Sequence, residues 1–173
     1  SNPGCYPTSI QLALVPIIKK NLISLSEITI DSKSGYSGAG KNLKKKFKHK
    51  NIYSSTFAYA VNHHRHICEI DQELKNKTGK KVKFTFNPHL LPTYRGLLSS
   101  IYVKLKPNSS AKKIRNKLIN FYKKNKFVKN LKLNSEIGSG NVLNTNNCEI
   151  SVCETRLLNK VIIFSSIDNL VKG

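Results

Sequence analysis

The chain has 173 residues, of which 39% are hydrophobic, and 30 lysine and arginine residues against 9 acidic ones give it a formal net charge of +21. This length allows one domain with a substantial core, and the hydrophobic content excludes a disordered polyelectrolyte. No apolar run approaches the roughly 20 residues of a membrane-spanning helix, so we expect no membrane association. The start lacks the layout of a signal peptide, and the sequence contains no methionine. We therefore expect part of a longer protein.

The basic charge suggests nucleic acid or an anionic membrane as a partner. The composition of the basic residues argues against this, because 26 are lysine and only 4 are arginine. Proteins that read phosphates and base edges favour the bidentate fork of arginine. Lysine, asparagine and isoleucine, which share A/T-rich codons, supply 62 residues. We expect compositional drift to explain most of the charge and no nucleic acid to bind. A basic nucleic-acid-binding module is the alternative from another class.

In the first half of the chain, the apolar pattern predicts a helix over residues 7–23, kinked or shortened by Pro16. A strand over 28–34 follows and runs into a glycine-rich loop at 35–40 and a lysine-rich connector at 41–50. A short helix over 67–78 is expected to stop at Gly79.

In the second half, the sequence predicts strands over residues 81–87 and 97–105, separated by a loop at 88–96. A helix capped by Ser109 or Ser110 then extends to about residue 125. Three more strands are expected, over 127–133, 148–153 and 161–166, with a loop at 134–147. Strands and helices are interleaved without strict alternation, and no G-x-G-x-x-G follows a strand. The order predicts an α+β fold, a mixed, largely antiparallel sheet with helices packed on it.

Cys5 directly precedes the first predicted helix, in the segment S-N-P-G-C-Y-P-T. The free N–H groups and positive dipole at a helix start stabilise a thiolate and lower the pKa of the thiol. Such a thiolate attacks acyl carbons to give a thioester, and the same N–H groups can bind an oxyanion. A buried structural cysteine is the alternative. The four cysteines show no regular spacing, which favours a reduced, cytoplasmic protein without disulfides.

Three of the five histidines lie in residues 62–69, N-H-H-R-H-I-C-E. His64 or His66 can serve as general acid/base, with Glu69 orienting the imidazole and Arg65 binding an anionic substrate. The same stretch holds residues competent to bind zinc, namely His63, His64, His66 and Cys68. Their spacing matches no common zinc pattern, so we expect no metal.

Two further segments are weaker candidates for binding. The loop S-G-Y-S-G-A-G at residues 34–40 contains small residues that allow close approach to a phosphate or a ring. Arg95 lies among turn residues, and in a chain this poor in arginine it is a candidate for binding a carboxylate or a phosphate.

Five motifs, in order along the chain, resemble those of N-acetyl-gamma-glutamyl-phosphate reductases. Residues 1–8 resemble the segment around the catalytic cysteine, and residues 34–40 resemble the S-G-x-S-G-A-G loop. Residues 64–70 resemble H-R-H-x-P-E-I, residues 88–96 resemble P-H-L-x-P-x-x-R-G, and residues 168–173 resemble D-N-L-x-K-G. Cys68 replaces the proline of the third motif, and Asn87 replaces the threonine before the fourth.

The resemblance implies an NADPH-dependent oxidoreductase of arginine biosynthesis. Cys5 would attack the acyl phosphate and form a thioester, which hydride from NADPH would reduce to the semialdehyde. His64 would be the acid/base, with His66 as the second choice. The resemblance places these residues at the substrate: Arg65, Arg95, His66 and Glu69. It places these near the cofactor, NADPH or NADP: Ser37, Gly38, Gly40 and Asn169.

The resemblance also implies the domain organisation. Residues 1–173 would be a catalytic and dimerisation domain with the glyceraldehyde-3-phosphate dehydrogenase-like C-terminal fold. The N-terminal dinucleotide-binding domain and the closing C-terminal helix would lie outside the chain, so the domain alone would be inactive. The partners would be an acyl-phosphate substrate and further copies of the chain, in a dimer or a tetramer. Aspartate-semialdehyde dehydrogenase and the reductase of carrier-bound aminoadipate in lysine biosynthesis are the alternative enzymes.

Overall fold

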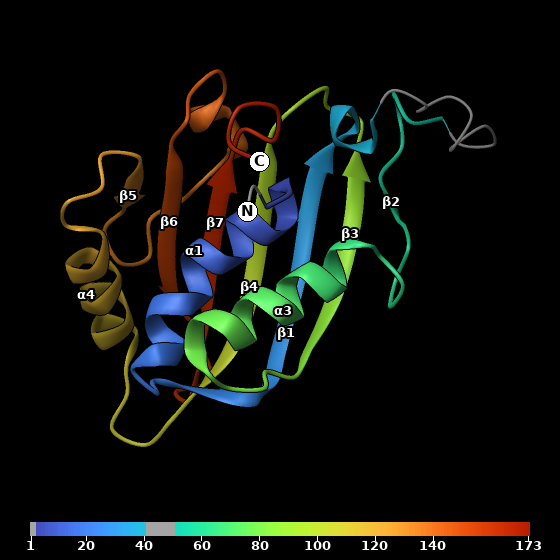
Figure 1. The fold of residues 1–173 in the computed structure, drawn as a ribbon. Helices are drawn as coiled ribbons and strands as arrows, with labels where there is room; N and C mark the ends of the chain where they lie inside the picture. Colours follow the sequence, from blue (N-terminus) through green and yellow to red (C-terminus); the bar gives the residue numbers. More distant parts are fainter. Residues whose placement is uncertain (1–2, 41–50) are drawn as a thin grey trace.

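The computed structural model describes residues 3–40 and 51–173. These residues form one seven-stranded sheet with the order β2-β3-β1-β4-β7-β6-β5 (Figure 1). Its strands are β1 (Ile23–Gly35), β2 (Phe57–Ala58), β3 (Phe84–Leu91), β4 (Leu97–Leu105), β5 (Val128–Asn130), β6 (Cys148–Glu154) and β7 (Lys160–Ile167). The pairs β1–β3 and β5–β6 are parallel, and the other four are antiparallel. The predicted α+β fold with a mixed, largely antiparallel sheet is confirmed.

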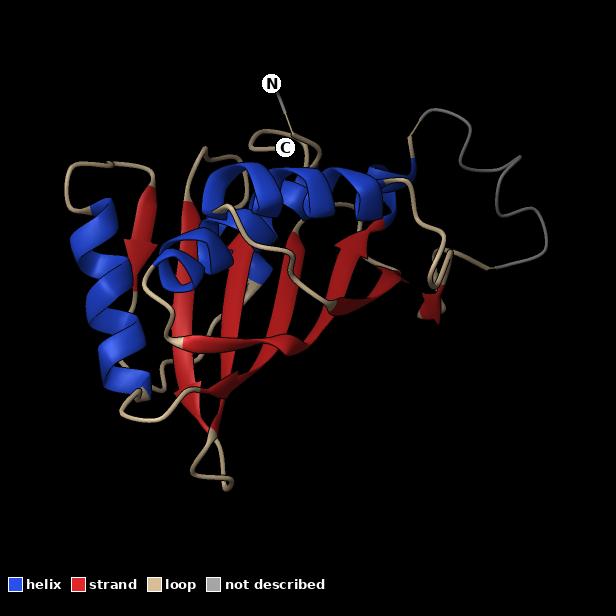
Figure 2. Ribbon diagram, turned by 60° about the horizontal axis from the view of Figure 1, so that its bottom comes forward, coloured by secondary structure: helices blue, strands red, loops and turns tan. Residues whose placement is uncertain are grey.

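Helices α1 (Cys5–Lys19) and α3 (His66–Thr78) cover the same face of this sheet (Figures 1 and 2). Their apolar sides are fully buried with the inward residues of the central strands, among them Ile10, Leu14, Ile30, Ile70 and Ile101. Helix α4 (Ala111–Tyr122) packs beside β5 and β6 at one edge. The core therefore lies between α1 and α3 and one side of the sheet.

Pro16 lies inside α1, which continues through it and ends at Lys19, four residues before the predicted end. A proline has no N–H to donate to the carbonyl four residues earlier, so the carbonyl of Leu12 loses its helical partner. The hydroxyl of Tyr122 donates to that carbonyl at 2.8 Å. A side chain of α4 thus replaces the missing bond and fixes α4 against α1.

Several boundaries of helices and strands that the sequence predicts match the structure. Gly79 ends α3 in the left-handed conformation, with φ of 68°, and the hydroxyl of Ser110 caps α4 by accepting from the Lys113 N–H at 3.1 Å. Strand β4 has the predicted bounds. The expected loop over 35–40 contains a short 3-10 helix, η1 (Tyr36–Ala39), and the loop over 134–147 contains a second, η2 (Ser139–Val142). The expected connector at 41–50 lies outside the described residues.

Strand β3 differs from its prediction, because it begins and ends later than residues 81–87. Its last residues pair in parallel with the end of β1, in the register Ser32↔Pro88 to Gly35↔Leu91. On its other side, the two-residue strand β2 pairs with His89 and Leu90. Residues 88–91, predicted as loop, are therefore strand. The local pattern did not indicate their pairing with β1 on one side and β2 on the other.

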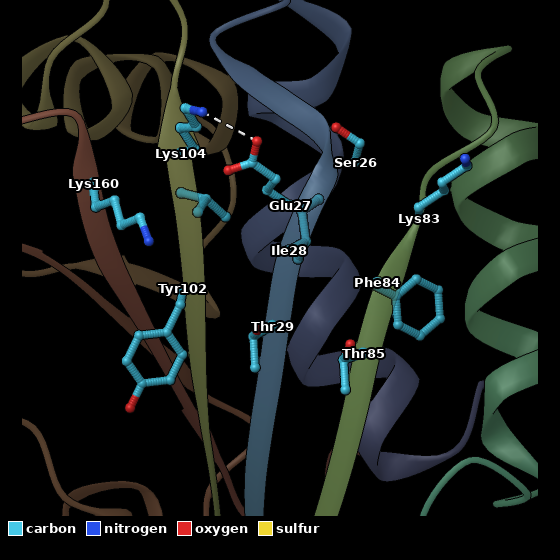
Figure 3. A pocket seen from close by; sticks show the side chains of 11 residues that line it. Ser26, Glu27, Ile28, Thr29, Lys83, Phe84, Thr85, Tyr102, Lys104 and Lys160 are labelled. Atoms are coloured by element: carbon cyan, nitrogen blue, oxygen red, sulfur yellow. Dashed lines mark hydrogen bonds and ion pairs between the residues drawn. The ribbon is translucent and has the colours of Figure 1, made fainter.

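The second face of the sheet is covered by neither α1 nor α3, and we call it the open face. Because side chains alternate along a strand, Thr29, Thr85 and Tyr102 point to this face while their neighbours point to the core. They line a hollow of about 460 Å³ whose rim carries Lys83, Lys104 and Lys160 (Figure 3). Lys104 pairs with Glu27 at 3.1 Å. Among the described residues, no helix is long and apolar enough to span a membrane.

Candidate active site

Cys5 is the first residue of α1, half-buried and not in a disulfide. The C-terminal end of the chain lies beside the start of α1 (Figure 1). Gly173 packs against the backbone of Cys5 so closely that a Cβ on it would overlap the Cys5 Cα. A glycine is therefore needed at this approach. Ser1 and Asn2, which belong to the cysteine motif, lie outside the described residues.

The first turn of α3 brings two predicted site residues to the start of α1. Glu69 accepts a hydrogen bond from the Gly4 N–H at 3.0 Å. His66, three residues earlier and on the same side of the helix, lies with its ring against Gly4. A Cβ built on Gly4 would come within 2.5 Å of the His66 Nε2 atom. The imidazole thus lies directly beside the residue that precedes the thiol.

Burial changes the acidity of both groups. Burial raises the pKa of the Cys5 thiol, although the backbone N–H groups of Tyr6 and Cys5 and the charge of Arg65 lower it. The helix start therefore acts in the expected direction, but the predicted net lowering is wrong because desolvation outweighs it. Burial and then Arg65 lower the pKa of His66, against the opposing charge of Glu69. Near neutral pH the site therefore holds a protonated thiol beside a neutral imidazole, the pairing that general-base activation needs.

His64 lies against His66, with the two ring centroids 4.8 Å apart. Its Nδ1 atom is 3.1 Å from the His66 N–H, and its Nε2 atom is 3.3 Å from the hydroxyl of Tyr59. Its ring contacts Tyr6 and Phe86 edge-on, with centroids 5.4 and 5.6 Å away. In contrast, the buried Nδ1 atom of His66 has no hydrogen-bond partner among the described residues. Of the two imidazoles, His66 is the one with an uncommitted ring nitrogen.

The two candidate arginines have different surroundings. Arg65 is exposed at the start of α3, and its charge acts on both Cys5 and His66. Arg95 instead binds the fully buried carboxylate of Asp168 through Nη2 at 2.8 Å and Nε at 3.2 Å. Burial alone would raise the pKa of Asp168, but the N–H groups of Leu170 and Asn144 and the Arg95 guanidinium lower it on balance. The structure thus places Arg95 where it holds the turn after β7.

Three of the four predicted cofactor residues lie together. Asn169 donates to the hydroxyl of Ser37 at 3.0 Å and accepts from the Gly96 N–H at 2.7 Å. A Cβ on Gly38 would approach the Ser34 hydroxyl to 2.7 Å, which explains a small residue there. Gly40 ends η1 with φ of 82° and faces open space. The Asn169 amide therefore links the 3-10 helix η1 to the turn after β7.

Sequence reasoning missed several residues of this region. Tyr6 and Tyr59 flank the histidines, and their hydroxyls are 3.2 Å apart. The role of Asp168 as the partner of Arg95 was also missed, although it stands in the last motif. In the described part of the chain, no group of three or more histidine, cysteine or acidic side chains could hold a metal ion.

Comparison with known proteins gives the class. The profile of the family described as "Semialdehyde dehydrogenase, dimerisation domain" matches residues 5–169. The fold resembles aspartate semialdehyde dehydrogenase II from Vibrio cholerae, with a TM-score of 0.75 at 12% identity over 99% of this chain and 57% of that one. The enzyme from Francisella tularensis gives a TM-score of 0.73 at 13% identity over 99% of this chain and 60% of that one. The chain belongs to the semialdehyde dehydrogenase dimerisation-domain family.

Within this class, the similar curated proteins share one name. The chain is 45% identical to an N-acetyl-gamma-glutamyl-phosphate reductase of Brachyspira hyodysenteriae, over 99% of this chain and 49% of that protein. It is 43% identical to a probable chloroplastic N-acetyl-gamma-glutamyl-phosphate reductase of Arabidopsis thaliana, over 100% of this chain and 43% of that protein. The expected resemblance is confirmed. The chain spans about half the length of these relatives.

The contact between Gly4 and His66 gives a prediction. Gly4→Ala places a methyl group on the imidazole and displaces the His66 ring from Gly4, because an atom at that position lies 2.5 Å from Nε2. We expect the full-length protein to lose about 1–3 kcal/mol of stability, the scale of an overpacked contact, and the nitrogen-15 resonances of the His66 ring to shift. Gly140→Ala, where no atom lies within 4 Å of the added Cβ, is the control. Thermal unfolding and nitrogen-15 histidine spectra measure both variants, and unchanged stability with unchanged His66 resonances in Gly4→Ala would contradict the contact.

Proposed function

We propose that this domain is the catalytic and dimerisation half of an NADP-dependent N-acetyl-gamma-glutamyl-phosphate reductase of arginine biosynthesis. The observation that carries the proposal is the cysteine at the start of α1, with the His66 imidazole packed against the preceding Gly4. The similarity to reductases of that name over the whole chain supports it.

In this proposal, Cys5 supplies the nucleophile and His66 the base. The neutral imidazole accepts the thiol proton as sulfur attacks the acyl carbon, and the backbone N–H groups at the start of α1 face the charge that develops on the oxygen. The bond to phosphate breaks, and the acyl group stays on Cys5 as a thioester. The proton held by His66 then returns to the sulfur when the C–S bond breaks and the semialdehyde leaves. His64, the first choice from the motif, is placed less favourably for these steps.

The bound nicotinamide, as NADPH, would supply the hydride that reduces the thioester. Ser37, Gly38 and Asn169 lie together, and Gly40, directly after η1, faces open space where such a group fits. In the proposal they flank the cofactor, while the Asn169 amide keeps η1 and the last turn together. Most cofactor contacts would come from a dinucleotide-binding domain outside this chain.

Exposed Arg65 is the proposed site for the substrate's anionic groups, because its charge acts directly at the thiol. Glu69 fixes the Gly4 backbone, directly before Cys5, through its hydrogen bond. Arg95 contributes indirectly, by holding the turn that carries Asn169. A reducing compartment such as the cytoplasm suits the four free cysteines.

Replacement of the nucleophile tests the proposed reaction. In the full-length enzyme, Cys5→Ser should lower kcat by at least about a thousandfold, because a hydroxyl at this position is a far weaker nucleophile than a thiol. Cys68→Ser, on the exposed side of α3, should retain normal turnover. Oxidation of NADPH with the acyl phosphate as substrate measures both. Near-normal turnover in Cys5→Ser would contradict the covalent mechanism.

We also propose that two copies pair through the open face. Neither α1 nor α3 covers it (Figure 2), and Tyr102 at its centre is 41% exposed. The family is described as a dimerisation domain. A sheet face that carries an exposed aromatic side chain is suited to burial against a second copy.

Tyr102→Glu should therefore dissociate the full-length assembly, because the interface would lose an aromatic side chain and gain a carboxylate that is costly to bury. Phe121→Glu replaces an aromatic residue of similar exposure, 44%, on α4 and should leave the assembly intact. Sedimentation velocity gives the mass of each variant. An unchanged mass for Tyr102→Glu would exclude the open face.

A further inference from the structure

Beside the thiol, a continuous chain of hydrogen bonds joins the main chain of α3 to that of β3. It begins at the N–H of His66, which is 3.1 Å from His64 Nδ1, and passes from His64 Nε2 to the Tyr59 hydroxyl at 3.3 Å. The Tyr59 hydroxyl is 3.2 Å from that of Tyr6, and the Tyr6 hydroxyl is 3.2 Å from the carbonyl of His89. We call these three side chains the His64–Tyr59–Tyr6 chain.

The two ends of the chain fix the position of every proton in it. A backbone N–H can only donate, so His64 Nδ1 accepts and the ring proton is on Nε2. At the other end a carbonyl can only accept, so Tyr6 donates to His89 and accepts from Tyr59. Tyr59 has then used its one proton and accepts from His64 Nε2. Both ends independently give the same tautomer of His64.

This arrangement holds His64 neutral. A second ring proton, on Nδ1, would point at the His66 N–H, which is also a donor. The hydrogen bond between His66 and His64 would then be lost. Both ring nitrogens of His64 therefore bind the protein's own groups, and a proton from Cys5 has no place on it. The chain instead caps the start of α3, where the first N–H groups have no partner within the helix.

We propose that the His64–Tyr59–Tyr6 chain is a positioning device that fixes the backbone of His66 beside Cys5, and that His64 is a positioning residue rather than the acid/base. The inference rests on the proposed function, in which His66 receives the thiol proton. It follows from the contacts of His66: its N–H binds His64, its ring lies on Gly4, and Tyr6 packs against it with centroids 5.8 Å apart. The charges of Arg65 and Glu69 act on the pKa of His66, and the titratable rings that face it are Tyr6 and His64, the latter with its centroid 4.8 Å away.

The test uses the full-length enzyme and four variants, two in the chain, one in His66 and one control. Tyr59→Phe removes the central hydroxyl and keeps the ring. His64→Asn keeps an acceptor for the His66 N–H and removes the imidazole. His63→Asn is the matched control, because His63 is the exposed adjacent histidine and its ring lies 2.8 Å from the nearby Val61 carbonyl, outside the His64–Tyr59–Tyr6 chain.

We expect Tyr59→Phe and His64→Asn each to lower kcat by about tenfold, the scale of one lost hydrogen bond, with KM nearly unchanged. In both variants kcat/KM should still fall toward acid pH. This fall reports protonation of the base His66, whose pKa lies below the ordinary 6.5 of histidine. His66→Asn should remove this fall and lower kcat by about a thousandfold. Loss of the acid fall in His64→Asn, or unchanged kcat in Tyr59→Phe, would overturn the inference.

A measurement without substrate separates this inference from the proposed reaction. In protein labelled with nitrogen-15 histidine, the resonances lost in His64→Asn identify His64, and their shifts report which nitrogen carries the proton. We expect the Nε2–H form across neutral pH. A proton on Nδ1 would overturn the chain whatever the activity. An intact tautomer in a protein that does not reduce acyl phosphates would instead refute the proposed function alone.

Discussion

The hydrogen bond from the Gly4 N–H to Glu69, 3.0 Å long, is the contact on which the rest of the site depends. It joins the start of α1 to the first turn of α3, although the two residues are 65 positions apart in the chain. Because it uses an N–H at the helix start, it satisfies a donor that α1 itself cannot. The same turn of α3 then places His66 on Gly4, so one contact sets the position of both thiol and imidazole.

The burial that this contact creates explains the chemistry that the site favours. A helix start alone would favour a thiolate at rest, but desolvation raises the pKa of Cys5 and lowers that of His66. Both groups are therefore neutral until a reaction begins. In the proposed mechanism, charge forms only as the thiol attacks, when the helix N–H groups can stabilise it. Because the thiolate is the form that reacts with oxidants, a thiol that stays protonated is also less easily oxidised.

Local signals in the sequence predicted much of the fold. The alternating apolar residues of β4, the glycine after α3 and the serine before α4 act through their immediate neighbours, and the structure has them as predicted. Strand β2 could not be predicted, because two residues carry no pattern and pair only through the register of β3. The same limit applies to Arg95, whose partner Asp168 is 73 residues away and reaches it only across the folded sheet. The motif placed both histidines at the site, but spacing alone could not decide between them, since the choice depends on where α3 begins.

The measurement that tests the account most directly is the mass of the Cys5 peptide after the full-length protein is mixed with N-acetyl-gamma-glutamyl phosphate in the absence of NADPH. The account predicts release of about one phosphate per subunit and an acyl group attached to Cys5, which disappears when NADPH is added. Full turnover without an adduct on Cys5, or an adduct on another cysteine that NADPH removes, would contradict it.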